Sequence, residues 1–355
     1  MNNLRLLLLP LAFVYGAAVW LRNIFFDLGL LPSRSFSVPV ISVGNLSTGG
    51  TGKTPHVEYL VGMLDGHYKV AVLSRGYKRK TRGFLVANQN STVNDLGDEP
   101  LQMHRKFPKI LVAVDEKRRR GIRNILTLYP DINLIILDDA FQHRYVKPGL
   151  NLLLTEYYKP FFRNYLLPVG SLREPKSGAR RADALIVTKT PEVFSPLDRQ
   201  FFLKKLSSCQ LNNIFFSYLN YGVMKPLTPN TPEEEPENIK SIFLLTGIAN
   251  SVALEEELKT RCQELFMHKY PDHHQFVPTD INKLVKHFNS TISHCKIVLT
   301  TEKDAMRLQD EKLQNLLADI PVYYLPVQTG FHTKDMEKFH QMIMTFLRQF
   351  SENRL

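Results

Sequence analysis

The sequence contains little cysteine, and this scarcity argues against two familiar classes of protein. Its 355 residues include three cysteines, Cys209, Cys262 and Cys295, which are odd in number and widely spaced. A disulfide framework needs paired cysteines and a cysteine zinc site needs closely spaced ones, so neither is indicated. We therefore expect the chain to function in a reducing, intracellular compartment.

Internal repeats and low-complexity tracts are also absent from the sequence. Hydrophobic residues make up 44% of the 355-residue chain and charged residues only 22%, so the chain can bury a large core and is expected to form two domains. The net charge of +11 indicates an anionic partner, which is a nucleotide, a nucleic acid or a membrane surface. Charge alone does not choose among these three.

One glycine is missing from an otherwise recognisable phosphate-binding loop. The segment VGNLSTGGTGKTP at 43–55 carries Ser47 where the pattern Gly-x-x-x-x-Gly-Lys-Thr begins with glycine. The apolar run 38–43 predicts a buried strand before the loop, and apolar residues at helical spacing from Val57 to Leu64 predict a helix after it. Pro55 suits the first turn of that helix, where its missing N–H costs nothing.

A loop of this kind binds the phosphates of ATP with backbone N–H groups at a helix N-terminus. Lys53 is expected to reach the outer phosphates, and Thr54 to bind the Mg²⁺ that accompanies the nucleotide. A glycine-rich surface turn is the alternative, which the flanking strand and helix disfavour. The expected nucleotide contacts are Ser47, Thr48, Gly49, Gly50, Thr51, Gly52, Lys53 and Thr54.

Continuous apolar runs alternate with helix-like segments such as Arg119 to Tyr129, which is typical of parallel strands covered on both faces. The pattern predicts an α/β fold with a doubly wound, mostly parallel sheet like that of the phosphate-loop NTPases, whose ligands bind at the carboxyl ends of the strands. The predicted strands of this sheet are 70–73, 110–114, 134–137, 152–154 and 184–187.

Residues 225–238, which are rich in proline and acidic side chains, interrupt this pattern and predict a loop or linker. Beyond them, apolar runs at 242–246, 297–300 and 322–325 predict a second, smaller α/β unit. We therefore divide the chain into an N-terminal helix (1–30), a phosphate-loop domain (31–222), a linker (223–240) and a smaller α/β domain (241–355), whose last helix can pack back on the first domain.

Carboxylates follow the predicted strands at the rim where the loop lies. Asp138 and Asp139 end the run 134–137, where phosphate-loop enzymes place the acids that hold Mg²⁺ or its water shell. Solvated acids at an ordinary strand exit are the alternative. The segments SRGY at 74–77 and GDEP at 97–100 are expected at the same rim, and Asp98 is the candidate for orienting an acceptor hydroxyl.

The apolar run Leu6 to Leu21, flanked by Arg5 and Arg22, would reach about 24 Å as a helix, short of the roughly 30 Å hydrocarbon core of a bilayer. A full membrane span is therefore not favoured. A signal peptide would export the nucleotide loop to a compartment without ATP. We expect a helix in the cytoplasmic leaflet, with Trp20 and Arg22 at the headgroups, and keep a buried core helix as the alternative.

Two other functions compete with phosphoryl transfer to an acceptor hydroxyl. A phosphate-loop GTPase or ATPase switch acting on a protein partner would need a guanine-reading Asn-Lys-x-Asp, which Thr188–Pro191 and Thr301–Asp304 only loosely approach. A nucleic-acid binder would need aromatic side chains beside the basic run Lys117–Arg123, and that run has none. We therefore expect no nucleic-acid partner, and no obligate protein partner is evident.

Eight segments in order are similar to those of the tetraacyldisaccharide 4'-kinase family, the lipid A 4'-kinases of Gram-negative bacteria. The resemblance covers nearly the whole chain, and Ser47 in the loop is itself similar to the family's form. The matching segments are VGNLSTGGTGKTP at 43–55, SRGY at 74–77, GDEP at 97–100, DDAFQHR at 138–144, LREP at 172–175, LTGIAN at 245–250, PDHH at 271–274 and TEKDA at 301–305.

This resemblance implies transfer of the ATP γ-phosphate to the 4'-hydroxyl of a tetraacyl glucosamine disaccharide 1-phosphate, which forms lipid IVA. It implies a cytoplasmic-leaflet location at the inner membrane, because a substrate with four acyl chains does not leave a bilayer readily. ATP and Mg²⁺ are the implied cofactors.

The resemblance also implies roles for individual residues. Asp98 would work with a histidine, either His273 or its neighbour His274, and His273 is the one we select. Arg173 would contact the transferred phosphate beside Lys53. The implied substrate contacts are Tyr77, Glu99 and Arg118.

Overall fold

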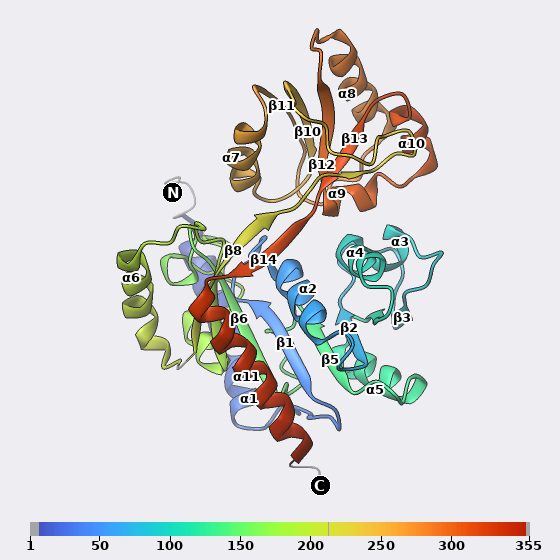
Figure 1. Cartoon of the computed structure of the whole chain (residues 1–355). Coiled ribbons are helices and arrows are strands. Elements are labelled where there is room, and N and C mark those ends of the chain that lie inside the picture. Colours follow the sequence, from blue (N-terminus) through green and yellow to red (C-terminus); the bar gives the residue numbers. More distant parts are fainter. Residues whose placement is uncertain (1–6, 212, 353–355) are drawn as a thin grey trace.

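The computed structural model describes residues 7–211 and 213–352, and these residues form two stacked units, each built on one sheet (Figure 1). Arg5 and Leu6, which belong to the predicted membrane-associated segment, lie outside the described residues. The division into domains at fixed boundaries stays a prediction.

The larger sheet contains nine strands within the described residues, and the strands from β8 to β4 run parallel. The two edge strands, β14 and β3, each pair antiparallel with their neighbour. The predicted mostly parallel, doubly wound sheet is thus confirmed. In spatial order the strands are β14 (Val327–Phe331), β8 (Ile214–Tyr221), β7 (Ala184–Thr188), β6 (Leu150–Glu156), β1 (Val40–Asn45), β5 (Leu134–Asp138), β2 (Val70–Ser74), β4 (Leu111–Val114) and β3 (Leu85–Val86).

Helices cover both faces of the larger sheet, which is why its strands are continuous apolar runs. The helices α2, α4 and α11 bury apolar side chains on one face, and α5 and α6 on the other. Along β1, Ile41 and Val43 point to the first face and Val40 to the second. The helices that accompany this sheet are α2 (Lys53–Leu64), α3 (Val93–Leu96), α4 (Asp98–Lys106), α5 (Arg118–Leu128), α6 (Pro196–Leu206) and α11 (Thr333–Glu352).

The smaller unit has a sheet of five strands in the described residues, with α7 packed on one face and α8 and α10 on the other. Its sheet confirms the three predicted strands and adds two that the sequence analysis did not identify, β11 and β9. The order of its strands is β11 (Glu264–Lys269), β10 (Ser241–Thr246), β12 (Lys296–Thr301), β13 (Val322–Leu325) and β9 (Lys225–Pro226). Its helices are α7 (Val252–Arg261), α8 (Pro278–Ser290), α9 (Glu302–Arg307) and α10 (Glu311–Leu317).

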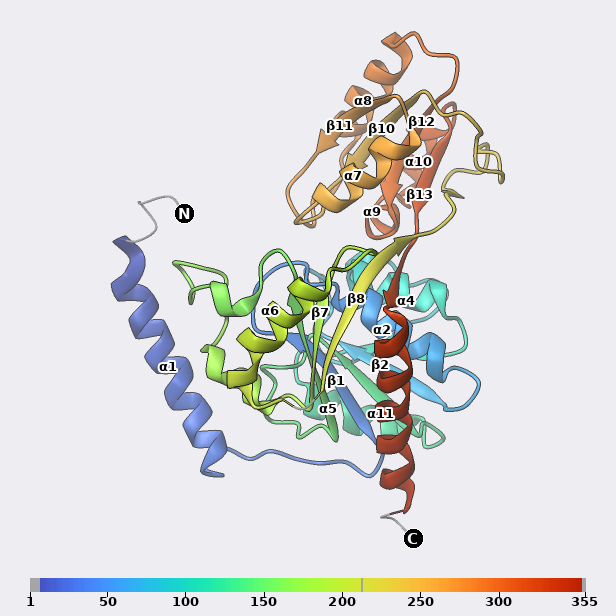
Figure 2. The same cartoon turned by 60° about the vertical axis from the view of Figure 1, so that its left-hand side comes forward.

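Two antiparallel strands, β8 and β14, connect the units: the chain rises through β8 and returns through β14 (Figures 1 and 2). Neither strand was predicted, and both lie in the larger sheet. After β14 the chain continues into α11, whose Phe339, Ile343 and Leu347 are buried against the larger core. The smaller unit is therefore tethered at both of its ends, and α9 faces α4 of the larger unit across the gap between the sheets.

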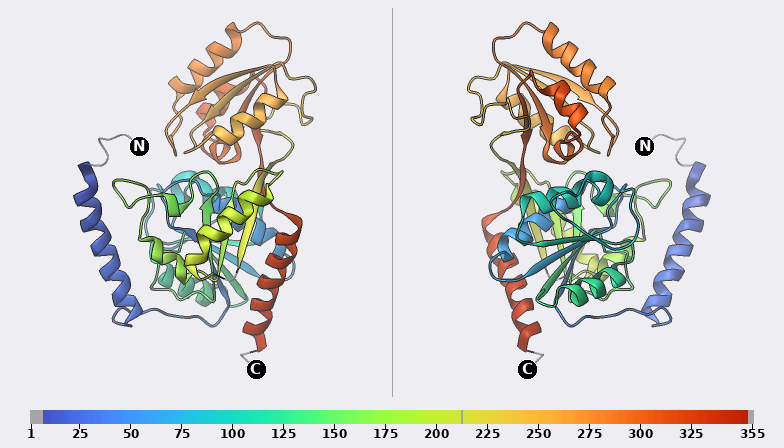
Figure 3. Two further views of the ribbon diagram at one scale, coloured as in Figure 1. Left: turned by 90° about the vertical axis from the view of Figure 1, so that its left-hand side faces the viewer. Right: turned by 90° about the vertical axis from the view of Figure 1, so that its right-hand side faces the viewer.

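The helix α1 (Leu9–Asp27) begins and ends later than predicted, and it lies along the opposite side of the larger unit from α11 (Figure 3). It is the one helix among the described residues that is long and apolar enough to cross a membrane, judged by length and composition alone. Its carboxyl half is tied to the larger unit: Arg22 donates to the carbonyl of Gln142, and Asn23 donates to Glu174. A buried core helix is excluded, since Leu11, Phe13, Val14 and Trp20 are all more than half exposed.

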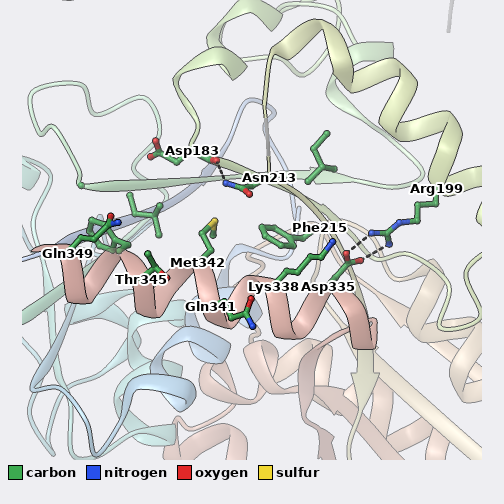
Figure 4. Close-up of a pocket in the computed structure, with 14 residues that line it drawn as sticks. Asp183, Arg199, Asn213, Phe215, Asp335, Lys338, Gln341, Met342, Thr345 and Gln349 are labelled. Carbon is green, nitrogen blue, oxygen red and sulfur yellow. Dashed lines mark hydrogen bonds and ion pairs between the residues drawn. The ribbon is translucent and has the colours of Figure 1, made fainter.

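A groove of about 580 Å³ lies between α11 and the amino ends of β6, β7 and β8 (Figure 4). At one end, the two terminal nitrogens of the Arg199 guanidinium donate to the Asp335 carboxylate, at 2.7 and 2.6 Å. Because ligands of doubly wound sheets bind at the carboxyl ends of the strands, this groove lies on the edge away from the expected site.

Candidate active site

The phosphate loop joins the carboxyl end of β1 to the first turn of α2, as predicted. Gly49 and Gly52 have φ angles of +110° and +82°, which only glycine adopts without strain, and they turn the chain into the helix. The Thr51 hydroxyl accepts a 2.7 Å hydrogen bond from Asn45, and the Thr51 carbonyl accepts a 2.9 Å one from Thr188. The loop is therefore held by hydrogen bonds from two strands, β1 and β7, and it begins α2 with the positive end of the helix dipole.

Lys53 leaves this loop toward the carboxyl end of β5. Its Nζ lies 3.7 Å from a carboxylate oxygen of Asp139, and Arg173 donates to both oxygens of the same carboxylate at 3.0 and 3.1 Å. Burial opposes ionisation of Asp139, but the charges of Lys53 and Arg173 prevail and hold its pKa below the usual value. The structure thus brings together three predicted residues, two cations around one anion, from three different segments.

Asp138, next to Asp139, is the buried member of the pair. Its Oδ2 accepts a hydrogen bond from Ser74, whereas its Oδ1 is buried without a hydrogen-bond partner among the described residues. Burial, together with the nearby charges of Glu99 and Asp139, raises the pKa of Asp138 to about 7. A buried carboxylate oxygen that accepts no hydrogen bond is suited to ligate a cation.

Arg118 lies behind the strand ends, with a fully buried side chain. Its guanidinium donates to the backbone carbonyls of Asp115 and Asp138, at 2.6 and 3.0 Å. Burial lowers its pKa to about 10, which leaves it charged at neutral pH beneath the two aspartates. Its assignment as a substrate contact stays a prediction. The hydrogen bonds to Asp115 and Asp138 stabilise the carboxyl end of β5.

Asp98 and His273 are in direct contact, although 175 positions separate them and they belong to different units. The Nδ1 of His273 lies 2.8 Å from the Oδ2 of Asp98. His274 instead contacts Asp280 at 2.8 Å, at the first turn of α8, and stacks on Tyr270. Of the two neighbouring histidines, His273 is therefore the one that pairs with Asp98.

Asp98 is held at the start of α4 by close backbone packing. The preceding Gly97 has a φ of +88°, and a side chain there would lie 2.8 Å from the carbonyl of Tyr77. The segments SRGY and GDEP are therefore in contact, and Asp98 is only 3% exposed. Burial opposes its ionisation, but the hydrogen bond to His273 and the charges of Lys303 and Arg307 hold its pKa well below the usual range.

A cavity of about 350 Å³ joins these groups to the N-terminal helix. Tyr77 and Glu99 line it near the Asp98–His273 pair, since the Tyr77 ring centroid lies 4.8 Å from that of His273. Asp138, Asp139 and Arg173 line the side toward the phosphate loop. The remaining lining residues are Tyr15, Val19 and Arg22 from α1, with Ser74, Arg75, Gln142, His143 and Glu174.

The sequence analysis did not single out several residues of this site. Lys303 and Arg307 reach Asp98 from α9, within and just beyond the segment TEKDA. Gln142 and His143 line the cavity from the segment DDAFQHR. Both residue pairs lie in or beside segments, TEKDA and DDAFQHR, that match the family, and this match is the feature of the sequence that points to them. The sequence did not predict that α1 contributes to the cavity, because this contribution depends on where the helix lies against the larger unit.

A parallel sheet that carries a glycine-rich loop, a lysine at the start of the next helix and acids on a neighbouring strand defines a phosphate-loop nucleotide-binding protein. Comparison with known proteins narrows this class. A family model described as Tetraacyldisaccharide-1-P 4'-kinase matches residues 4–348, so the chain belongs to the tetraacyldisaccharide 4'-kinase family.

Relatives and a solved structure agree with this membership. The chain is 44% identical to a tetraacyldisaccharide 4'-kinase of Parabacteroides distasonis, over 95% of this chain and 93% of the relative. It is 42% identical to one of Bacteroides thetaiotaomicron, over 98% of this chain and 94% of the relative. The fold is similar to that of LpxK from Aquifex aeolicus in complex with ATP, with a TM-score of 0.72, 30% identity and coverage of 97% and 99% of the two chains.

Proposed function

We propose that this chain transfers the γ-phosphate of ATP to the 4'-hydroxyl of a tetraacyl glucosamine disaccharide 1-phosphate, a step of lipid A synthesis that forms lipid IVA. Membership of the kinase family supports the reaction. The cavity of about 350 Å³ carries the proposal structurally, because its wall runs from Asp138 and Asp139 at the end of β5 to the exposed apolar helix α1.

This cavity suits a substrate with a polar head and several acyl chains. Its polar wall includes Arg75, Arg173 and Glu99, which can hydrogen-bond to sugar hydroxyls and phosphate. Val19 and Tyr15 of α1 form the boundary at which the apolar side chains of the helix begin. The acyl chains would then remain beside α1 and the lipid while the sugar enters the cavity.

On the nucleotide side, the phosphate loop binds the triphosphate with its backbone N–H groups, and Lys53 and Arg173 offset the negative charge of the transferring group. In the structure both cations contact Asp139. The carboxylate thereby holds them at the rim, close to where the outer phosphate of a loop-bound nucleotide lies.

Mg²⁺ fits this site, on the evidence of the unpartnered Asp138 Oδ1 beside Asp139. The described residues contain no cluster of three His, Cys, Asp or Glu side chains that would hold a metal alone. That agrees with Mg²⁺, which is usually held by one or two carboxylates together with substrate phosphates and water. Asp138, Asp139 and Thr54 would hold the ion, and when bound it neutralises charge on the phosphates.

On the acceptor side, Asp98 offers one carboxylate oxygen to the substrate. Its Oδ2 accepts from His273 and Arg307, whereas the only protein donor to its Oδ1 among the described residues is the N–H of Glu99. We infer that Oδ1 orients the 4'-hydroxyl and accepts its hydrogen bond as the oxygen attacks phosphorus. The proton of the 4'-hydroxyl passes to Oδ1 of Asp98, while the Nδ1–H of His273 donates to the other carboxylate oxygen and holds the carboxylate in place.

We infer that α1 lies at the cytoplasmic leaflet of the inner membrane, where ATP is available. Its polar residues Arg22 and Asn23 are bound to the larger unit, which leaves the apolar side chains free to contact lipid. A helix so attached can lie in the interface without carrying the enzyme across the bilayer. Replacing exposed Phe13 and Trp20 by glutamate should reduce sedimentation with vesicles of inner-membrane composition, whereas Val193→Glu, on an exposed loop, should not.

A nucleotide-dependent switch acting on a protein partner, the alternative, is not favoured by family membership. One experiment tests the kinase directly. Purified protein is incubated with γ-labelled ATP, Mg²⁺ and the tetraacyl disaccharide 1-phosphate in detergent micelles. Label should move into the lipid fraction as a 4'-phosphomonoester, and release of free phosphate at the same rate with or without the glycolipid would contradict the proposal.

A further inference from the structure

The segment TEKDA has no part in the reaction described so far, yet it faces the candidate base. It forms the first turn of α9, and Lys303 and Arg307, four positions apart, lie on the same face of this helix. Both side chains extend across the gap between the sheets to the GDEP segment at the start of α4.

Arg307 binds Asp98 from a fully buried position. Its Nε and one terminal nitrogen donate to the Oδ2 of Asp98, at 3.2 and 2.8 Å, and the side chain of Arg307 is 0% exposed. The other terminal nitrogen donates to the carbonyls of Gly247 and His274, both at 3.3 Å. One guanidinium therefore links the base of the larger unit to the loop of the smaller unit that carries His273.

Lys303 completes the same arrangement from the side of Glu99. Its ammonium group lies 3.0 Å from the Glu99 carboxylate and 3.3 Å from the Nε2 of His273. Because an ammonium only donates, this contact favours the histidine tautomer that carries its proton on Nδ1, which donates to Asp98. The tautomer of His273 is thus set from both ends of the ring.

Asp304 fixes α9 itself, so that the two cations are not loose. Its Oδ2 accepts from the hydroxyl of Thr301 at 2.6 Å and from the N–H of Gly247 at 3.1 Å, while its Oδ1 accepts from Arg307 at 2.8 Å. Asp304 is completely buried. The segments LTGIAN and TEKDA are therefore bound to each other through Asp304, and together they position the side chains of Lys303 and Arg307.

We propose that Lys303 and Arg307 are positioning residues for phosphoryl transfer, which hold Asp98, Glu99 and His273 in register across the two units. This inference rests on the kinase function proposed above and extends it to a motif with no assigned role. Neither cation needs to touch the nucleotide, because each acts through a carboxylate or the imidazole.

The chain provides a matched control for a purely structural role. Arg199 makes a similar two-point ion pair with buried Asp335, in the groove of Figure 4 and away from the cavity. Loss of Arg199 should lower stability without altering the reaction. Loss of Arg307 or Lys303 should alter the reaction itself.

The experiment compares Lys303→Met, Arg307→Met, Arg307→Lys and Arg199→Met in the label-transfer assay with the full chain. We expect kcat to fall about 10- to 100-fold in Arg307→Met and Lys303→Met, with the KM for ATP changed less than about 2-fold, since misplacement of reacting groups lowers kcat without weakening nucleotide binding. Arg307→Lys should recover part of the loss, and Arg199→Met should keep the parental kcat.

The pH dependence of kcat separates positioning from general loss of structure. Lys303 helps to keep Asp98 ionised, so its removal favours the protonated carboxyl and the acidic limb of the profile should move to higher pH by about one unit in Lys303→Met. It should not move in Arg199→Met. The charged groups that face His273 are Asp98 from α4, Lys303 and Arg307 from α9, Asp272 from its own loop and Lys78, whose Nζ lies 3.5 Å from the His273 carbonyl.

Parental kcat and an unmoved acidic limb in Lys303→Met and Arg307→Lys would overturn the inference, and would do so even if Arg307→Met fails to fold. An inactive parent chain gives a different result: it contradicts the proposed function, and this inference with it. Selective loss of kcat in the α9 variants of an active parent supports both.

Discussion

The two halves of the candidate site are assembled in different ways. The nucleotide half lies entirely in the larger unit: β1, the phosphate loop and the first turn of α2 follow one another from Val40 to Thr54, and Asp138, Asp139 and Arg173 join them from the same unit. The acceptor half combines Asp98 from α4 with His273, Lys303 and Arg307 from the smaller unit. It exists only where the two units meet.

This difference teaches where the site is robust and where it is vulnerable. The phosphate loop depends on hydrogen bonds within the larger unit, such as those from Asn45 and Thr188 to Thr51, which do not involve the smaller unit. The acceptor half depends on the connection through β8 and β14 and on the contact of α9 with α4. We therefore expect damage to the first half to affect nucleotide binding and catalysis together, and damage to the second half to affect catalysis alone.

The largest effect is expected from Lys53→Ala in the nucleotide half. Removing the cation that offsets charge on the outer phosphates should lower kcat/KM about 10³- to 10⁵-fold and also raise the KM for ATP. Steady-state kinetics in the label-transfer assay measures both. Lys69→Ala removes a surface lysine paired with Asp131 and should leave both parameters unchanged. A near-parental rate in Lys53→Ala would remove that residue from its role.

The next largest effect is expected from Asp98→Asn in the acceptor half. The amide keeps the shape of the side chain but cannot accept the hydroxyl proton, so kcat should fall about 10²- to 10⁴-fold. The KM for ATP should stay within about 2-fold of the parent, because Asp98 does not contact the phosphate loop. A rise in the KM for ATP comparable to that of Lys53→Ala would contradict the separation of the two halves.

The neighbouring histidines should differ sharply. His273→Gln should lower kcat about 10²-fold, because His273, and not His274, contacts Asp98. His274→Gln should keep kcat near the parental value and lower the free energy of unfolding by about 1 kcal/mol, because its ring binds Asp280 at the start of α8. Kinetics and urea unfolding of both variants make the comparison, and equal losses of kcat would be inconsistent with the geometry.

The last effect concerns stability alone, behind the phosphate loop, where His56 is completely buried between the carbonyl of Gly52 and the hydroxyl of Ser217. Burial lowers the pKa of His56 from 6.5 to about 4. As pH falls from 6.5 to 4, His56 is protonated in the unfolded chain but stays neutral in the folded chain. The free energy of unfolding therefore decreases by up to about 3 kcal/mol over this range. In His56→Gln, urea unfolding across this range should lose that part of the slope. An unchanged slope would show that His56 does not titrate in this way.

Much of the nucleotide half could be predicted from sequence, because it is local. A strand, a glycine loop, Lys53 and a helix lie within one short segment, and the acids Asp138 and Asp139 directly follow an apolar run that forms β5. The strand pattern also predicted the larger sheet, since residues buried on both faces are apolar without interruption.

The acceptor half was accessible only in part. Resemblance to a family indicated that Asp98 works with His273 or His274. The choice between them depends on a tertiary contact between residues 175 positions apart in the sequence. The role of Arg307 could not be predicted, because the sequence does not show whether an arginine is buried or exposed. The strands β8 and β14 were missed because polar residues such as Ser217 and Gln328 interrupt their apolar residues, so neither strand has a long continuous apolar run.

The most direct test of this account is a double-mutant cycle on kcat for Asp98→Asn and His273→Gln. If the two residues act as one unit across the junction of the sheets, the double variant should lose little more activity than the more damaged single variant, with the KM for ATP still close to the parental value. A double variant whose loss equals the product of the two single losses would show that Asp98 and His273 act independently, and would contradict the assembly of the acceptor half described here.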